Sequence, residues 1–273
     1  MRRSLSLLLM SLLLAGTLFA QHNNAGHAQP DASQRSSRTD HGPTGVNLSL
    51  WKNISTQRTD TVGSTCFNLG VFSSMNRLNG LGMNLLASVT GRDVNGVQLA
   101  GLSNMVGGSM RGIQLAGITN INGNNLTGLS VSGLVGITGN HAQGITLSGL
   151  ANISGDHNRG ISIGGLLNIS GERASGMHLA GVADISGENF KGFSGTGLLS
   201  VIGKSLNGLQ MSGLGNITAG DMTGVQISGL GNVTGGTVRG VQISATNMAM
   251  RAKGLQIWLF NYYKEKLDGF QLG

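Results

Sequence analysis

Apolar and polar residues alternate along this chain in a unit of 16 residues. Glycine opens ten consecutive units, at positions 96, 112, 128, 144, 160, 176, 192, 208, 224 and 240, and in nine of them a second glycine follows five residues later. Apolar residues at the second and fourth positions flank a polar third position, which is the period of a β-strand with one buried face. The pattern predicts that Leu99 and Ile113 face inward and that Gln98 and Gln114 face outward.

Two more apolar positions recur in the unit, the seventh and the tenth. The seventh-position row is Leu102, Ile118, Leu134, Leu150, Leu166, Val182, Leu198, Leu214 and Leu230. The tenth-position row is Met105, Ile121, Ile137, Ile153, Ile169, Ile185, Val201, Ile217 and Val233. We expect both rows to be continuous in the folded chain.

A period of 16 residues is shorter than the helical repeats and the propeller blades, and it fits one turn of a narrow β-solenoid. We therefore predict an all-β fold, a single-stranded right-handed or left-handed β-solenoid (parallel β-helix) with regular coils over 80–253 and degenerate coils from residue 45. The unit that opens at Gly240 shortens to 14 residues. Aromatic residues gather after it and predict a C-terminal cap over 254–273, with Trp258, Phe260, Tyr262, Tyr263 and Phe270.

The first 44 residues have a different composition. Arg2 and Arg3 precede an apolar run, and Ala20 ends a small-residue cleavage site, which predicts a secretory signal peptide over 1–20. Polar residues, glycine and both prolines fill 21–44 and predict a disordered linker before the repeat domain at 45–273. No other stretch approaches 18 apolar residues, so no transmembrane segment is predicted in the mature chain. We expect an exported protein at the cell surface, in the periplasm or in the medium.

Composition narrows the class of protein further. Glycine accounts for 47 of 273 residues and charged residues for 11%, which excludes a charge-rich disordered chain. The net charge is +7, but aromatic residues are scarce and are not interleaved with Lys and Arg, so nucleic-acid binding is not expected. The single cysteine, Cys66, allows no internal disulfide.

Titratable residues line up at one place in the unit. Asp156, Glu172 and Glu188 occupy the thirteenth position of three consecutive coils, and His141 and His157 occupy the fourteenth position of two. Carboxylates and imidazoles are metal ligands, so these five are the weak candidates for a metal site. Basic residues on the same edge favour a solvated loop edge instead, and no metal or other cofactor is predicted.

The polar third-position row is the candidate binding face. Its glutamines are Gln98, Gln114, Gln210, Gln226 and Gln242, and the remaining coils carry Ser, Thr or His178. The row holds no carboxylate pair of the kind that cleaves polysaccharides, so no catalytic residue is predicted. A neutral face of this kind suits shallow binding of glycans or of another surface.

Asparagine dominates the ninth position. Asn104, Asn120, Asn152, Asn168, Asn216 and Asn232 occupy it, with Asp184 in one coil. Side-chain amides repeated along a β-stack hydrogen-bond to one another, which predicts a structural ladder.

The recurring phrase from Gly224 to Asn232, GVQISGLGN, resembles the exported GLQ-x-x-GL-x-N surface-repeat proteins that are frequent in Bacteroidota and some spirochaetes. The resemblance covers 45–273 and implies an exported or cell-surface location, with no assigned catalytic residues. Asp60-Thr61-Val62 also resembles the O-glycosylation signal of that bacterial group.

These observations predict a secreted or cell-surface, non-enzymatic repeat protein with a structural or adhesive role. The alternative is a glycan- or host-surface-binding module that uses the Gln/Ser/Thr face, and a polysaccharide-active β-helix enzyme is less favoured. Glycans or cell-surface components are the expected partners, and self-association stays open.

Overall fold

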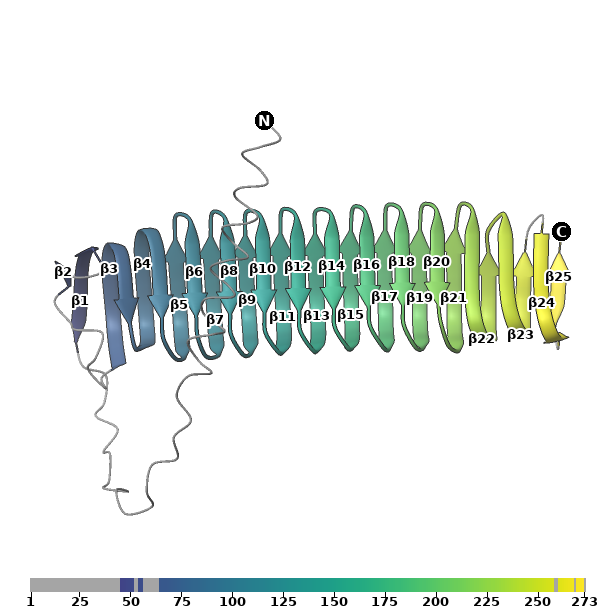
Figure 1. Ribbon diagram of the computed structural model, residues 1–273, viewed down its shortest axis with the longest axis horizontal. Coiled ribbons are helices and arrows are strands. Elements are labelled where there is room, and N and C mark those ends of the chain that lie inside the picture. The colour runs from purple at the N-terminus through teal and green to yellow at the C-terminus, as the bar shows by residue number, and fades with distance from the viewer. Residues whose placement is uncertain (1–44, 52–53, 56–63, 258–259, 268, 273) are drawn as a thin grey trace, which may run out of the picture. The chain divides into compact units, whose positions relative to one another are not determined.

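The computed structural model describes residues 45–51, 54–55, 64–257, 260–267 and 269–272. The predicted signal peptide and linker, and the Asp60-Thr61-Val62 triplet, lie outside the described residues. The described chain is all β, and no helix lies within it. The strands stack along one axis, from β2, which pairs with β1, at one end to β24 and β25 at the other (Figure 1).

The strands fall into four groups. The N-terminal strands are β1 (Val46–Trp51), β2 (Ile54–Ser55), β3 (Ser64–Met75) and β4 (Arg77–Thr90). The longer strands of the regular coils are β5 (Val94–Ala100), β7 (Met110–Ala116), β9 (Leu126–Ser132), β11 (His141–Ser148), β13 (His157–Gly164), β15 (Arg173–Ala180), β17 (Phe190–Thr196), β19 (Leu206–Ser212) and β21 (Met222–Ser228). The shorter strands are β6 (Ser103–Val106), β8 (Thr119–Asn122), β10 (Val135–Thr138), β12 (Ala151–Ser154), β14 (Leu167–Ser170), β16 (Ala183–Ser186), β18 (Leu199–Ile202) and β20 (Gly215–Thr218). The C-terminal strands are β22 (Gly231–Ile243), β23 (Thr246–Ile257), β24 (Phe260–Leu267) and β25 (Phe270–Leu272).

The coils pair in parallel at the predicted period. In β11, β13 and β15 the opening glycines Gly144, Gly160 and Gly176 lie opposite one another. The predicted shortening near the C-terminus is confirmed, because Gly254 lies opposite Gly240. A β-solenoid of about 13 turns results, in which the long strands form one sheet and the short strands form the facing one.

The prediction of which side faces inward is wrong. Gln98 and Gln114 are fully buried, whereas Ile113 is exposed and Leu99 is half-buried. The interior holds repeat positions 3, 5, 9, 11 and 15, and the apolar second, fourth, seventh and tenth positions lie on the outside. The amides tolerate burial because each bonds to the coil before or after it at the spacing of the ladder.

One apolar row does lie inside, at repeat position 15. Met110 and Leu126 belong to one buried cluster, and Phe190, Leu206 and Met222 belong to another. These side chains pack at the turn end of the long strands, next to the buried amides. The core is therefore a narrow apolar strip beside a polar hydrogen-bonded interior.

The backbone conformation at the first position of the unit requires glycine. Gly160 has φ +123°, which L side chains rarely adopt, and a Cβ there would collide with the Gly144 carbonyl oxygen. The second glycine of the unit has a different reason: Gly149 is not among the positive-φ glycines, but a Cβ would meet the Gly133 carbonyl oxygen. Both sites need glycine because adjacent coils approach closely.

Two of the aromatics in the predicted C-terminal cap have side chains that the structure describes. Tyr262 lies opposite Met248 and is exposed, and Phe270 lies opposite Leu255 and is 79% exposed. Both continue outer rows of the solenoid in its last two strands. Trp258 lies outside the described residues, and the side chains of Phe260 and Tyr263 are not described.

Candidate functional site

The predicted Gln/Ser/Thr binding face is an internal hydrogen-bonded ladder. Gln98, Gln114, Gln210, Gln226 and Gln242 are all fully buried. Gln242 Nε2 donates to Gln226 Oε1 at 2.8 Å, and Gln226 Nε2 donates to Gln210 Oε1 at 2.8 Å. Side chains without exposed surface cannot contact a glycan, so the predicted outward orientation of this row is wrong.

The predicted asparagine ladder is confirmed. Asn216 Nδ2 donates to Asn232 Oδ1 at 2.9 Å, and Asn232 Nδ2 donates to Asn247 Oδ1 at 3.1 Å. Each ladder amide also reaches a main-chain carbonyl of the next coil, as Asn168 Nδ2 does with the Leu179 oxygen at 2.7 Å. The ladder ties both sheets together, so its role is structural.

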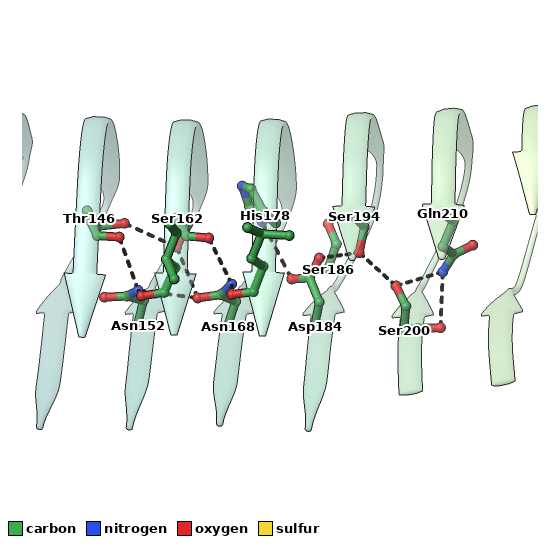
Figure 2. Close-up of polar contacts among 12 residues, drawn as sticks. Thr146, Asn152, Ser162, Asn168, His178, Asp184, Ser186, Ser194, Ser200 and Gln210 are labelled. Atoms are coloured by element: carbon green, nitrogen blue, oxygen red, sulfur yellow. Dashed lines mark hydrogen bonds and ion pairs between the residues drawn. The ribbon is translucent and has the colours of Figure 1, made fainter. Parts of the chain in front are cut away.

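One coil carries ionisable groups inside the solenoid (Figure 2). His178 Nδ1 lies 3.5 Å from Asp184 Oδ1, and Ser194 Oγ donates to Asp184 Oδ2 at 2.6 Å. All three side chains are buried, and the His178 ring packs edge-on against Phe190 at 5.2 Å. The sequence pattern does not predict this pairing, although the third and ninth positions also meet in another coil, where Ser162 Oγ donates to Asn168 Oδ1.

This group does not have the arrangement of a nucleophilic triad. A catalytic histidine lies between the serine and the carboxylate, so that it can remove the serine proton. Here Asp184 lies between Ser194 and His178, and the three side chains are closed off from solvent. The arrangement replaces one step of the asparagine ladder, as Figure 2 shows.

The five metal candidates lie along one edge but do not converge. His157 Nδ1 is 3.7 Å from Glu172 Oε2, and Glu188 accepts a hydrogen bond from Lys204. The Lys204 hydrogen bond is the main reason that the pKa of the Glu188 carboxyl lies below its ordinary value. His141 packs edge-on against His157 at 4.8 Å. Over the described part of the chain, no group of three or more His, Cys, Asp or Glu could hold a metal ion.

Basic residues line a groove on the same edge. Arg159, Arg173 and Lys191 border it together with His141 and His157, and its volume is about 350 Å³. Arg159 projects from β13 on the same side as Ile161, since the two are separated by one residue of a strand. The groove therefore lies where the charged part of the surface meets an apolar one.

The outer surface of the solenoid is mainly apolar. We call the row of exposed leucines at the seventh position the leucine edge; its members are Leu102, Leu134, Leu150, Leu166, Leu198, Leu214 and Leu230, exposed by 36–62%. On either side lie two outer faces. The first outer face lies on the long strands from β5 to β21 and carries repeat positions 2 and 4, such as Ile113 and Leu115. The second outer face lies on the short strands from β6 to β20 and carries repeat positions 8 and 10, such as Ile153 and Ile217.

Charge is confined to the opposite edge. Between residues 80 and 253 every outward-facing Lys, Arg, Asp and Glu occupies repeat positions 13, 14 or 16, nine basic and five acidic residues. In the shortened last unit, Arg251 and Lys253 are assigned to positions 14 and 16 because they lie opposite Thr237 and Arg239. We call this turn the charged edge; its charged members are Arg92, Asp93, Arg111, Asp156, Arg159, Glu172, Arg173, Glu188, Lys191, Lys204, Asp221, Arg239, Arg251 and Lys253. The leucine edge and the remaining outer positions carry no charge over this range.

Comparison with known proteins returned nothing: no family model, curated protein or solved structure matches this chain. Among the described residues, no helix is long and apolar enough to cross a membrane.

Proposed function

We propose that this chain is an exported, non-enzymatic component of the cell surface with a structural or adhesive role, which it performs through its apolar outer surface. The observation that carries the proposal is the uncharged surface formed by the leucine edge and the two outer faces. Each face runs about 60 Å along the stacked coils and is about 13 Å wide, so each covers roughly 800 Å². A soluble monomer rarely exposes a contiguous apolar patch larger than about 600 Å², and larger patches mark interaction sites.

The interior of the solenoid also supports this proposal. Many of its amides and hydroxyls bond in ladders between coils, as those of Gln226 and Asn232 do, and so serve the stability of a rod. The signal-like N-terminus and the resemblance of the repeat to exported surface-repeat proteins favour export. The former alternative, glycan binding through the glutamine row, loses its support because that row is buried.

Adhesion tests the role. Purified full-length protein should bind alkyl-coated beads and not hydroxyl-coated beads, and a Leu150→Ser, Leu166→Ser, Leu198→Ser variant should lose most of that binding while keeping its circular dichroism spectrum. Equal binding to both bead types would contradict the proposal.

Two further assays address location and chemistry. Cell fractionation with surface protease shaving should place the chain at the outer surface, and recovery in the cytoplasm would contradict export. Polysaccharide hydrolysis that is lost on substitution of Asp156, Glu172 or Glu188 would contradict a non-enzymatic role.

A further inference from the structure

The separation of charge from apolar surface has a definite geometry. The leucine edge lies at one side of the flattened coil and the charged edge at the other, and the two outer faces connect them. In each long strand, positions 2 to 5 lie between the opening glycine and the turn that carries the leucine edge. At about 3.3 Å per residue this uncharged band is about 13 Å deep. One leaflet of a bilayer contributes about 15 Å of hydrocarbon.

The backbone amides of the leucine edge bond between neighbouring coils. Leu150 N donates to the Leu134 oxygen at 2.8 Å, and Leu166 N donates to the Leu150 oxygen at 2.8 Å. The neighbouring Ala151 N also bonds to the Leu134 oxygen, at 3.1 Å. Amides that bond between coils can enter hydrocarbon without being left unpaired, and backbone pairing is the main condition for a chain in lipid.

The charged edge suits anionic headgroups. Nine basic residues outnumber five acidic ones there between residues 80 and 253. The groove beside Arg159, Arg173 and Lys191 is open to a phosphate, which guanidinium groups bind through paired hydrogen bonds. Because Arg159 and Ile161 project from the same side of β13, a headgroup at the groove places its acyl chains along the first outer face.

We propose, building on the adhesive function above, that the solenoid docks edgewise into one leaflet of a membrane that contains anionic phospholipids. The leucine edge points toward the bilayer centre, the outer faces contact acyl chains, and the charged edge lies among the headgroups. A leaflet covers both faces and the leucine edge at once, whereas a second copy of the chain packed on one face leaves the other face and the edge in water. This difference favours lipid over self-association as the occupant.

Vesicle flotation tests the docking. Full-length protein should float with vesicles of phosphatidylcholine and phosphatidylglycerol in equal parts, and Arg159→Gln with Lys191→Gln should weaken partitioning about thirtyfold. The matched control, Asp156→Asn with Glu172→Gln, changes the same edge in the opposite sense and should strengthen partitioning. If the two double variants change partitioning alike, the headgroup assignment is wrong.

Orientation needs its own measurement. In a Cys66→Ser background, an environment-sensitive fluorophore at Leu166→Cys should be quenched by lipids brominated on their acyl chains, and the same fluorophore at Asp156→Cys should not. Equal quenching at both positions would contradict edgewise insertion.

The outcomes separate this inference from the adhesive function. Protein that binds alkyl-coated beads but stays with the aqueous phase in flotation, and that sediments as dimers or larger species, overturns membrane docking and leaves adhesion standing with a second copy as the occupant. Protein that binds neither beads nor vesicles overturns both.

Discussion

A fully buried glutamine offers the clearest energetic test of a polar interior. Gln210 Nε2 donates to Ser200 Oγ at 2.8 Å and to the Ser200 carbonyl oxygen at 3.0 Å. Its Oε1 accepts from Gln226 Nε2 at 2.8 Å and from Thr218 Oγ1 at 3.3 Å. Gln210→Leu keeps a similar volume and removes all four bonds, so it isolates their contribution to the free energy of unfolding.

The magnitude follows from two opposing effects. Four buried hydrogen bonds contribute about 4 kcal/mol at roughly 1 kcal/mol each. Burial of the leucine side chain offsets about 2 kcal/mol of that loss. We therefore expect Gln210→Leu to lower the free energy of unfolding by about 2 kcal/mol, which lowers Tm by about 4–8 °C in a domain of this size.

The neighbouring residue provides the control. Met211 is adjacent in β19, projects outward and is 38% exposed. Met211→Gln should change the free energy of unfolding by less than about 0.5 kcal/mol, as surface substitutions do. Thermal unfolding followed by circular dichroism measures both variants. A Gln210→Leu variant as stable as the parent, together with a strongly destabilised Met211→Gln, would refute the polar interior.

Three further predictions concern single positions. Gly160→Ala should lower Tm more than a typical surface substitution in thermal unfolding, because a Cβ at φ +123° also meets the Gly144 carbonyl oxygen; an unchanged Tm would contradict the close approach of the coils. Asp184→Asn restores the residue that most coils carry, so Tm should be kept or raised at pH 7, and a large fall would show that the carboxylate itself is needed. The hydrogen bond from Lys204 lowers the pKa of the Glu188 carboxyl. The ionised carboxylate therefore stabilises the folded state fully above its ordinary pKa of 4.5, and this stabilisation is lost as pH falls through the lowered pKa. The free energy of unfolding should therefore fall less at acidic pH in Glu188→Gln than in the parent protein. An equal fall in the two proteins would contradict the ion pair.

The sequence was sufficient to predict the period, the parallel stacking and the asparagine ladder. All three depend only on the residue types that recur every 16 positions. The pairing of Gly144 with Gly160 in neighbouring coils has this spacing. The orientation of the strands was not predicted, because a period of two defines two faces and does not say which one is buried.

The sequence nevertheless contained two signals for the correct orientation. Arg111 lies on the same side of β7 as Ile113 and Leu115, and a lone arginine must reach water. Position 9 and position 10 are adjacent in one strand, so a buried Asn152 requires an outward Ile153. Hydrophobicity alone places the apolar rows in the core, which conflicts with both signals.

The site was less predictable than the fold. The pairing of His178 with Asp184 depends on contact across the interior between positions 3 and 9, which only the closed coil reveals. The charge-free leucine edge could have been read from the sequence as a row, but its exposure depends on the orientation of the strands.

Solvent accessibility within a single strand tests the central claim, an apolar outside around a polar inside, most directly. Ser162 is fully buried and the next residue of β13, Ile163, is 37% exposed. In a Cys66→Ser background, Ile163→Cys should react quickly with a water-soluble maleimide under native conditions, and Ser162→Cys should react only after unfolding in denaturant. Rapid labelling of Ser162→Cys together with protection of Ile163→Cys would contradict the account.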